Sequence, residues 1–161
     1  REWIRPSRVR SQPGEWRHGN LPDERPSFFD RPVDEREIVR HKSWAPVEST
    51  VDEAACDLES LDFDFLLFRE LATGQDSVLS RVDDGTYRLR QLAPDDLALE
   101  HVVSTVTLDN TPVIDATVAE ARRLLDLSGE PFVFFREPAS RRAHVLYRRY
   151  DGHYGLVAPA D

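Results

Sequence analysis

Apolar residues recur at helical spacing in two stretches of the chain. In each stretch a threonine precedes a glutamate by three residues, the Thr-x-x-Glu capping box that marks the start of a helix. The two pairs are Thr50 with Glu53 and Thr117 with Glu120. The apolar positions that follow are Val51, Ala54, Ala55, Leu58 and Leu61 in the first stretch and Val118, Ala121, Leu124 and Leu125 in the second. The pattern predicts two helices of about three turns, each with one apolar face.

Strand-like segments surround each predicted helix. A continuous apolar run follows it directly, FLLF at 65–68 and FVFF at 132–135. Because side chains alternate between the two faces of a strand, a run that is apolar at every position must be buried on both sides. Two more β-rich segments then flank an Asp-Gly pair, which is a strong hairpin signal. A further β-rich segment precedes each helix, at 37–44 and 101–108. The two segments that flank the Asp-Gly pair are 77–82 and 87–92 in the first half and 144–150 and 154–157 in the second.

The two halves of the chain are copies of each other. At a register of 67 residues, positions 50–91 align with 117–158 without a gap and share 17 identities in 42 positions. We therefore predict a tandem duplication of a module ordered strand, helix, three strands, an α+β fold. The predicted parts are a linker at 1–35, a first copy at 36–92, a connector at 93–99 and a second copy at 100–161.

A module of this size buries too small a fraction of its surface to be stable alone. One helix covers only one face of the apolar strand, so the other copy should cover the second face. Both copies are on one chain, and the short connector gives internal pairing a high effective concentration. We expect an intramolecular pseudo-dimer, with segment exchange between chains as the alternative. The residues expected at the interface between the copies are Phe65, Leu67, Phe68, Phe132, Phe134 and Phe135.

The first 35 residues differ from the rest of the chain. They hold five prolines and no sustained period, which is typical of an extended linker. Their aromatic and aliphatic residues predict that part of the linker lies along a folded surface or a partner. The chain does not begin with methionine, so we expect that its natural N-terminus lies upstream.

Composition excludes several classes of function. No apolar run approaches the roughly 18–20 residues of a membrane-spanning helix and no signal-like stretch opens the chain, so a cytoplasmic protein without a membrane partner is expected. The single Cys56 can form neither an internal disulfide nor a cysteine-based zinc site, and its helical pattern predicts a buried thiol. The histidines lack ligand spacing and no nucleophile or phosphate-loop motif is present. We expect no enzyme, no cofactor, no metal and no small-molecule substrate.

The formal charge of −9 is unevenly distributed. Residues 1–20 carry five arginines against two glutamates, whereas 36–161 supply the whole negative balance. An acidic body can touch nucleic acid only through local patches. The candidate RNA-contacting residues are Arg5, Arg8, Arg10 and Arg17 in the linker and Arg141, Arg142, Arg148 and Arg149 on the last hairpin. The alternatives are a soluble basic tether and a solvated strand face paired with acids.

Four segments carry a resemblance to a known family. They are IVRHK at 38–42, the TVDEA helix start, DFLLFR at 64–69 and VLYRRYDGHYGLV at 145–157. Together they resemble the C-terminal domain of long-form ribosome hibernation promoting factors, in the tandem-duplicated form of actinobacterial dormancy-associated translation inhibitors. The resemblance covers 36–159. The first copy departs from it with Ser80, Val82, Asp83 and Arg88 where the second has Tyr147, Arg149, Tyr150 and Gly155.

The resemblance implies a function and a partner. In the family, an N-terminal domain occupies the decoding region of the small ribosomal subunit, and the C-terminal domain dimerises and joins two ribosomes. We expect that N-terminal domain to lie upstream of the present chain. The implied partner is the ribosome, through rRNA or ribosomal proteins of the small subunit. If internal pairing satisfies the dimerisation surface, the factor should hold single idle ribosomes inactive. The alternative is a protein–protein module that joins ribosomes, or binds a ribosomal protein, without RNA contact.

Overall fold

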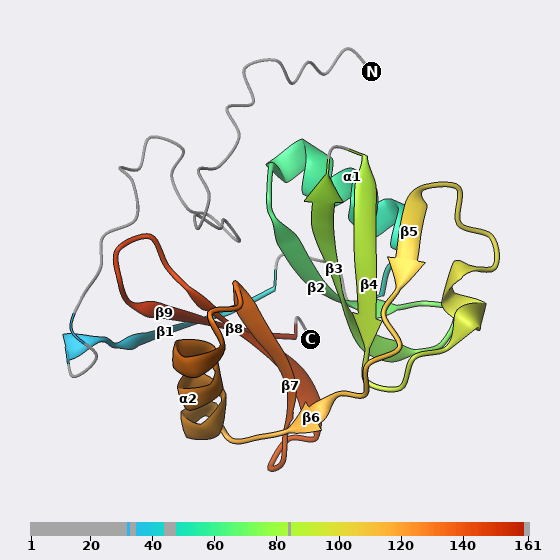
Figure 1. Ribbon diagram of the computed structural model, residues 1–161. Coiled ribbons are helices and arrows are strands. Elements are labelled where there is room, and N and C mark those ends of the chain that lie inside the picture. The colour runs from blue at the N-terminus through green and yellow to red at the C-terminus, as the bar shows by residue number, and fades with distance from the viewer. Residues whose placement is uncertain (1–31, 33–34, 44–47, 84, 160–161) are drawn as a thin grey trace.

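A computed structural model describes residues 32, 35–43, 48–83 and 85–159 (Figure 1). In chain order the elements are β1 (Ile38–Lys42), α1 (Val51–Leu61), β2 (Phe65–Glu70), β3 (Gln75–Asp83), β4 (Thr86–Gln91), the 3-10 helix η2 (Asp96–Leu99), β5 (Thr105–Leu108), β6 (Ile114–Asp115), α2 (Val118–Ser128), β7 (Phe132–Glu137), β8 (Arg142–Arg148) and β9 (Tyr154–Ala158). The prediction of an α+β fold is confirmed.

Both helices begin at the predicted capping boxes. The Thr50 hydroxyl accepts the backbone N–H of Glu53 at 3.1 Å, and the Glu53 carboxylate accepts the N–H of Thr50 at 2.9 Å. Thr117 and Glu120 repeat both bonds at the same distances. Each box satisfies two of the backbone donors that a helix start leaves without a partner. The helices therefore start at equivalent positions of the two copies.

The described strands form two sheets, the first with the order β2-β3-β4-β5 and the second with the order β1-β9-β8-β7-β6. Strand β5 pairs in parallel with β4, and β1 pairs in parallel with β9 (Figure 1). By sequence, β1 belongs to the first copy and β5 to the second. Each copy therefore gives its first strand to the sheet built by the other copy. This exchange interlocks the two halves of the chain.

Some predicted segments differ from the observed ones. The strand predicted at 101–108 forms only at 105–108, because the Asp52 carboxylate binds the backbone N–H groups of Val103 and Ser104 and holds them against the start of α1. The connector contains the unpredicted helix η2, and the short strand β6 was also not predicted. A parallel pair of two residues leaves no periodic signal in the sequence.

The core consists of three layers of apolar side chains. One lies between α1 and the first sheet, and one lies between α2 and the second sheet. The middle layer, which we call the inter-sheet cluster, joins the sheets. Its buried members are Phe65, Leu67, Val78, Phe134, Ala143, Val145, Tyr147 and Val157, with Leu92, Val113 and Phe132 packed against them.

Three sequence-based expectations about individual side chains are wrong. Phe68 and Phe135 lie in the helix-facing layers, not in the inter-sheet cluster. The physical reason is strand alternation: Phe68 is three residues after Phe65 and so points to the opposite face. Cys56 is exposed, since it lies on the face of α1 that points away from the sheet.

Candidate functional site

The linker arginines predicted to contact RNA, Arg5, Arg8, Arg10 and Arg17, lie outside the described residues. Their role stays a prediction. The four arginines of the last hairpin can be placed, and the structure does not bring them together as one patch. Arg141 and Arg142 lie at the start of β8, while Arg148 and Arg149 lie at its end. A strand of seven residues separates its ends by roughly 20 Å.

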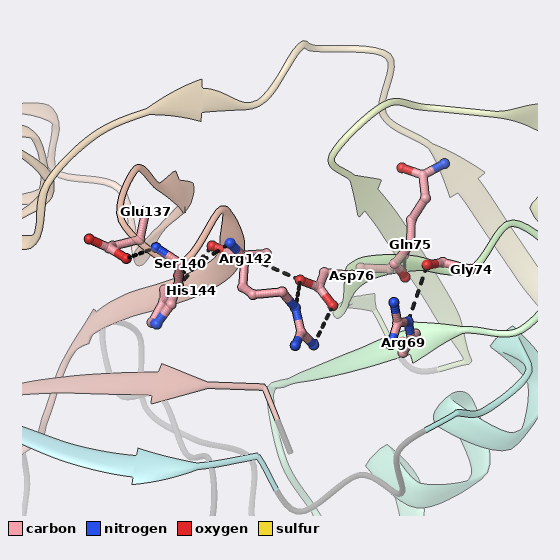
Figure 2. Close-up of polar contacts among 10 residues, drawn as sticks. Arg69, Gly74, Gln75, Asp76, Glu137, Ser140, Arg142 and His144 are labelled. Carbon is pink, nitrogen blue, oxygen red and sulfur yellow. Dashed lines mark hydrogen bonds and ion pairs between the residues drawn. The ribbon is translucent and has the colours of Figure 1, made fainter. Parts of the chain in front are cut away.

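Arg142 is engaged between the two copies. Its Nε donates to Asp76 Oδ2 at 2.8 Å and its Nη2 donates to Asp76 Oδ1 at 3.0 Å (Figure 2). Asp76 is on β3 of the first sheet and is only 4% exposed. A bidentate pair of this kind is strong and directional. The guanidinium of Arg142 is therefore committed to the interface between the copies.

Arg148 binds the helix of its own copy. Its Nη2 lies 3.4 Å from the carbonyl oxygen of Leu125 and 3.7 Å from Asp126 Oδ1, which also accepts the Tyr154 hydroxyl at 2.6 Å. The first copy repeats this arrangement with Arg81, Glu59 and Tyr87, whose hydroxyl donates to Glu59 at 2.6 Å. The repetition indicates that this arginine ties the sheet to the helix in both copies.

The remaining two hairpin arginines, Arg149 and Arg141, lie in different environments. Arg149 donates to Asp151 at 3.0–3.2 Å. Burial raises the pKa of Asp151, but the hydrogen bonds from Arg149 and from the His153 N–H outweigh it and hold that pKa below its ordinary value. Arg141 is exposed in the turn before β8, with a left-handed φ of 60°. Of the four hairpin arginines, Arg141 is the one that presents its side chain openly to solvent.

His144 and the edge strand β1 also affect where positive charge lies on the surface. Burial lowers the pKa of His144, whose ring stacks on Phe135 with centroids 5.9 Å apart, so His144 contributes less positive charge than an ordinary histidine would. On β1, Arg40 and Lys42 are exposed and lie two residues apart, hence on one face of the strand. Sequence reasoning missed them as a basic pair because their grouping depends on the strand assignment. They follow the linker directly along the chain.

The interface between the copies is asymmetric where the sequences of the copies diverge. The Tyr147 ring is fully buried in the inter-sheet cluster, 5.3 Å from the Phe65 ring. On the neighbouring strand Tyr147 is paired with Gly155, and a Cβ at that glycine would lie 2.3 Å from the ring. In the first copy the equivalent pair is Ser80 and Arg88. The departures noted in the sequence at these positions therefore serve packing between the copies.

Two further contacts cross the interface. The rings of Phe65 and Phe132, which are equivalent at the register of 67, lie 5.2 Å apart. Arg90 of β4 lies over the Phe134 ring, 5.3 Å from its centroid. Phe65, Leu67 and Phe134 are at most 1% exposed. The face that each copy turns to the other is thus filled on both sides.

The described residues hold no group of three histidine, cysteine or acidic side chains that could bind a metal ion. Among the same residues, no helix is long and apolar enough to cross a membrane. The two copies meet in the packed inter-sheet cluster, and the basic side chains of Arg40, Lys42 and Arg141 are exposed.

Comparison with protein families matches residues 33–89 and again 102–156 to the Sigma 54 modulation/S30EA ribosomal protein C terminus. The chain belongs to this family. The two matched segments correspond to the two copies, so the S30EA C-terminal domain occurs here twice in tandem, as the repeat predicts.

Curated relatives carry related names. A dormancy associated translation inhibitor of Mycobacterium tuberculosis is 32% identical over 136 residues, which is 76% of this chain and 47% of that protein. A ribosome hibernation promotion factor of Rhizobium meliloti is 34% identical over 90 residues, 55% of this chain and 45% of the relative. Another, from Bradyrhizobium diazoefficiens, is 43% identical over 49 residues, 30% of this chain and 24% of the relative. The chain spans about half the length, or less, of these relatives.

Proposed function

We propose that this chain is the C-terminal region of a ribosome-associated hibernation factor and helps to hold idle ribosomes inactive. Membership of the S30EA C-terminal family supports this, as do relatives named for ribosome hibernation and for dormancy-associated inhibition of translation. The chain acts as a binding module. Its partner is the ribosome, with the small subunit as the expected contact.

The inter-sheet cluster is the observation that carries the finer proposal, that the factor acts on single ribosomes without pairing them. In a chain with one copy, the face formed by Phe65 and Leu67 needs a second chain to cover it. Here the face of the other copy, including Phe134 and Val145, covers it within the same chain. A satisfied face offers no apolar surface for a second factor on another ribosome.

Basic residues of three segments are the proposed contacts with rRNA. They are Arg5, Arg8, Arg10 and Arg17 of the linker, together with the exposed Arg40 and Lys42 of β1 and the exposed Arg141. The linker leads into β1, but six acidic residues at positions 21–37 separate the two basic groups. Each group is therefore proposed to contact its own stretch of phosphate backbone. Arg142, Arg148 and Arg149 have acidic partners within the chain and are assigned to structure.

Ribosome profiles test the function. Cells that lack their own hibernation factor are given either a full-length factor containing this region or the same factor without residues 36–161. We expect the intact factor to enrich inactive single ribosomes and to produce no ribosome-dimer peak. A dominant dimer peak that needs residues 36–161 would contradict action on single ribosomes. Equal profiles for the two forms would contradict any role of this region in hibernation.

The alternative is a protein–protein module that touches a ribosomal protein and not RNA. The acidity of 36–161 and the internal pairing of three hairpin arginines favour it. Salt dependence separates the two cases. Each phosphate that the protein neutralises releases condensed counterions, so the affinity for RNA falls more steeply as the salt concentration rises. We expect a steep fall in binding to purified small subunits. A flat salt dependence would support the protein–protein alternative.

A further inference from the structure

The ion pair between Asp76 and Arg142 occurs at one of two equivalent places in the interface. At the register of 67, Asp76 corresponds to Ala143, and Arg142 corresponds to Gln75. The second copy therefore has no carboxylate where the first has one, and the first copy has no arginine where the second has one. In an interface between two identical copies, symmetry would repeat the pair at both places, so a pair that occurs once requires two different copies.

The carboxylate of Asp76 lies close to the pseudo-two-fold axis of the chain. Besides the two bonds from Arg142, its Oδ2 accepts the backbone N–H of Ala143 at 2.9 Å. Ala143 is the counterpart of Asp76 at the register of 67, so the carboxylate reaches across to its own equivalent position. With 4% exposure, Asp76 depends on these three bonds to compensate for lost hydration.

This geometry ranks the three ways in which copies could pair. Two first copies would bring two Asp76 carboxylates together in a buried place, with no arginine to neutralise them. Two second copies would bring two Ala143 residues together and leave both Arg142 side chains without a carboxylate. Only a first copy with a second copy supplies one acid and one arginine. We propose that the Asp76–Arg142 pair selects the pairing of a first copy with a second copy. Because each chain holds one of each at high effective concentration, its own two copies then pair with each other.

Two other contacts favour the same choice. Arg90 lies over Phe134, whose counterpart in the first copy is Leu67, so two first copies would lose the aromatic ring beneath the guanidinium. Tyr147 fills space opposite Phe65, and its counterpart is Ser80. Two second copies would have to fit two tyrosines where the mixed pair holds one, which is overpacking. Selectivity of this kind uses unfavourable contacts in the wrong pairs as well as favourable ones in the right pair.

The inference concerns the interface alone, and its test needs no ribosome. Two variants of the 161-residue chain, Asp76→Arg and Arg142→Asp, are unfolded and refolded separately and as an equal mixture, with one of them isotopically labelled. Within each variant, positions 76 and 142 carry like charges across the internal interface. When a chain of one variant pairs with a chain of the other, position 76 of each chain meets an opposite charge at position 142 of its partner. In native mass spectrometry, we expect the mixture to give mainly mixed dimers, which contain one chain of each variant. The wild-type chain should give monomers alone.

A matched control uses the ion pair within the second copy. Asp115→Arg and Arg136→Asp alter a bidentate pair whose two members both belong to the second copy, so these charges do not cross the interface. Their mixture should give no more mixed dimers than wild type. Mixed dimers in the control at the level of the test pair would assign the effect to general destabilisation and overturn the proposal. So would a test mixture that refolds only to monomers.

The neutral double variant Asp76→Asn/Arg142→Gln provides a second measurement if charge reversal prevents folding. When labelled and unlabelled forms are refolded together at high concentration, we expect the fraction of mixed dimers to rise several-fold over wild type. An unchanged fraction would contradict the selectivity. A wild-type chain that itself refolds mainly to dimers would instead contradict internal pairing, and neither result would alter the assignment to ribosome binding.

Discussion

Position 155 is a glycine because the ring of Tyr147 occupies the space of its Cβ. The distance of 2.3 Å from that Cβ to the ring leaves no room for relaxation within the packed inter-sheet cluster. We expect Gly155→Ala to lower the free energy of unfolding by about 1–3 kcal/mol, the usual cost of overpacking. Denaturant titration of the purified chain measures this change.

The first copy provides the control for that substitution. Arg88 occupies the equivalent position beside the smaller Ser80 and is exposed. Arg88→Ala should therefore change stability by less than about 0.5 kcal/mol. If Gly155→Ala were equally mild, the ring of Tyr147 would not be the constraint on position 155.

Arg141 has a backbone conformation that suits glycine better. Its φ is 60°, and the equivalent residue of the first copy is Gly74, with φ 70°. A side chain with a Cβ in this region costs roughly 1–2 kcal/mol, part of which is offset because glycine gains more freedom on unfolding. We expect Arg141→Gly to raise stability by about 0.5–1 kcal/mol in a thermal or denaturant scan. Gly74→Arg should lower it by a similar amount, and a loss of stability in Arg141→Gly would contradict the argument.

At the scale of elements, Asp52 connects helix α1 to the segment before β5. Its carboxylate accepts the N–H groups of Val103 and Ser104, both at 3.0 Å, and the Ser104 hydroxyl at 2.6 Å. Burial raises the pKa of Asp52, but these three bonds outweigh burial and hold the pKa below its ordinary value. The unfolded chain therefore binds this proton at a higher pH than the folded chain. The stabilisation is complete above the unfolded pKa and is lost as pH falls through the folded pKa.

Asp52→Ala, the residue found at position 119 in the second copy, tests this connection. We expect the variant to be less stable than wild type by about 1 kcal/mol at pH 7. The difference should shrink as pH falls below the ordinary pKa of an aspartate, because the folded wild-type chain then takes up the proton of Asp52. Unfolding free energies at several pH values give the curve. Asp57→Ala is the matched control: partial burial, then the charge of Glu53, raises the pKa of Asp57, so its removal should not lower stability at pH 7.

The helices and hairpins could be predicted because their signals are local. A capping box spans four residues and an Asp-Gly turn spans two, and both fix backbone geometry without help from the rest of the chain. The parallel pairing of β1 with β9 joins Ile38 to Tyr154, which are far apart in the sequence. Its register depends on which edge of which sheet is free, and that is decided only when both sheets exist. The strand exchange could therefore not be predicted from the local sequence patterns.

The hairpin arginines show the same limit at the candidate site. The sequence places Arg142, Arg148 and Arg149 within eight residues, but their acidic partners come from β3, α2 and the following turn. Only the fold brings the carboxylates of Asp76 and Asp126 close to these arginines, whereas Asp151 follows Arg149 by two residues. One signal was available in the repeat alignment: Gln75 and Asp76 stand against Arg142 and Ala143, a change in charge at two adjacent positions.

On the scale of the whole molecule, the strand exchange couples the stability of the two sheets. Opening the first sheet frees β5, which belongs to the second copy, and exposes the inter-sheet cluster that covers the second sheet. The two copies should therefore unfold in one cooperative transition, although each has its own helix-facing layer. Repeats that are joined only end to end can instead unfold separately.

Leu58→Ala tests this coupling, because Leu58 is fully buried between α1 and the first sheet. We expect a loss of about 2–5 kcal/mol in stability. Amide hydrogen exchange should accelerate by the same factor in β2 of the first sheet and in β7 of the second, since both are protected by the same global opening. Leu125→Ala, the equivalent change beside α2, should give the mirror result. If each substitution accelerated exchange only in its own sheet, the copies would be independent units, and the exchanged strands would not transmit stability between them.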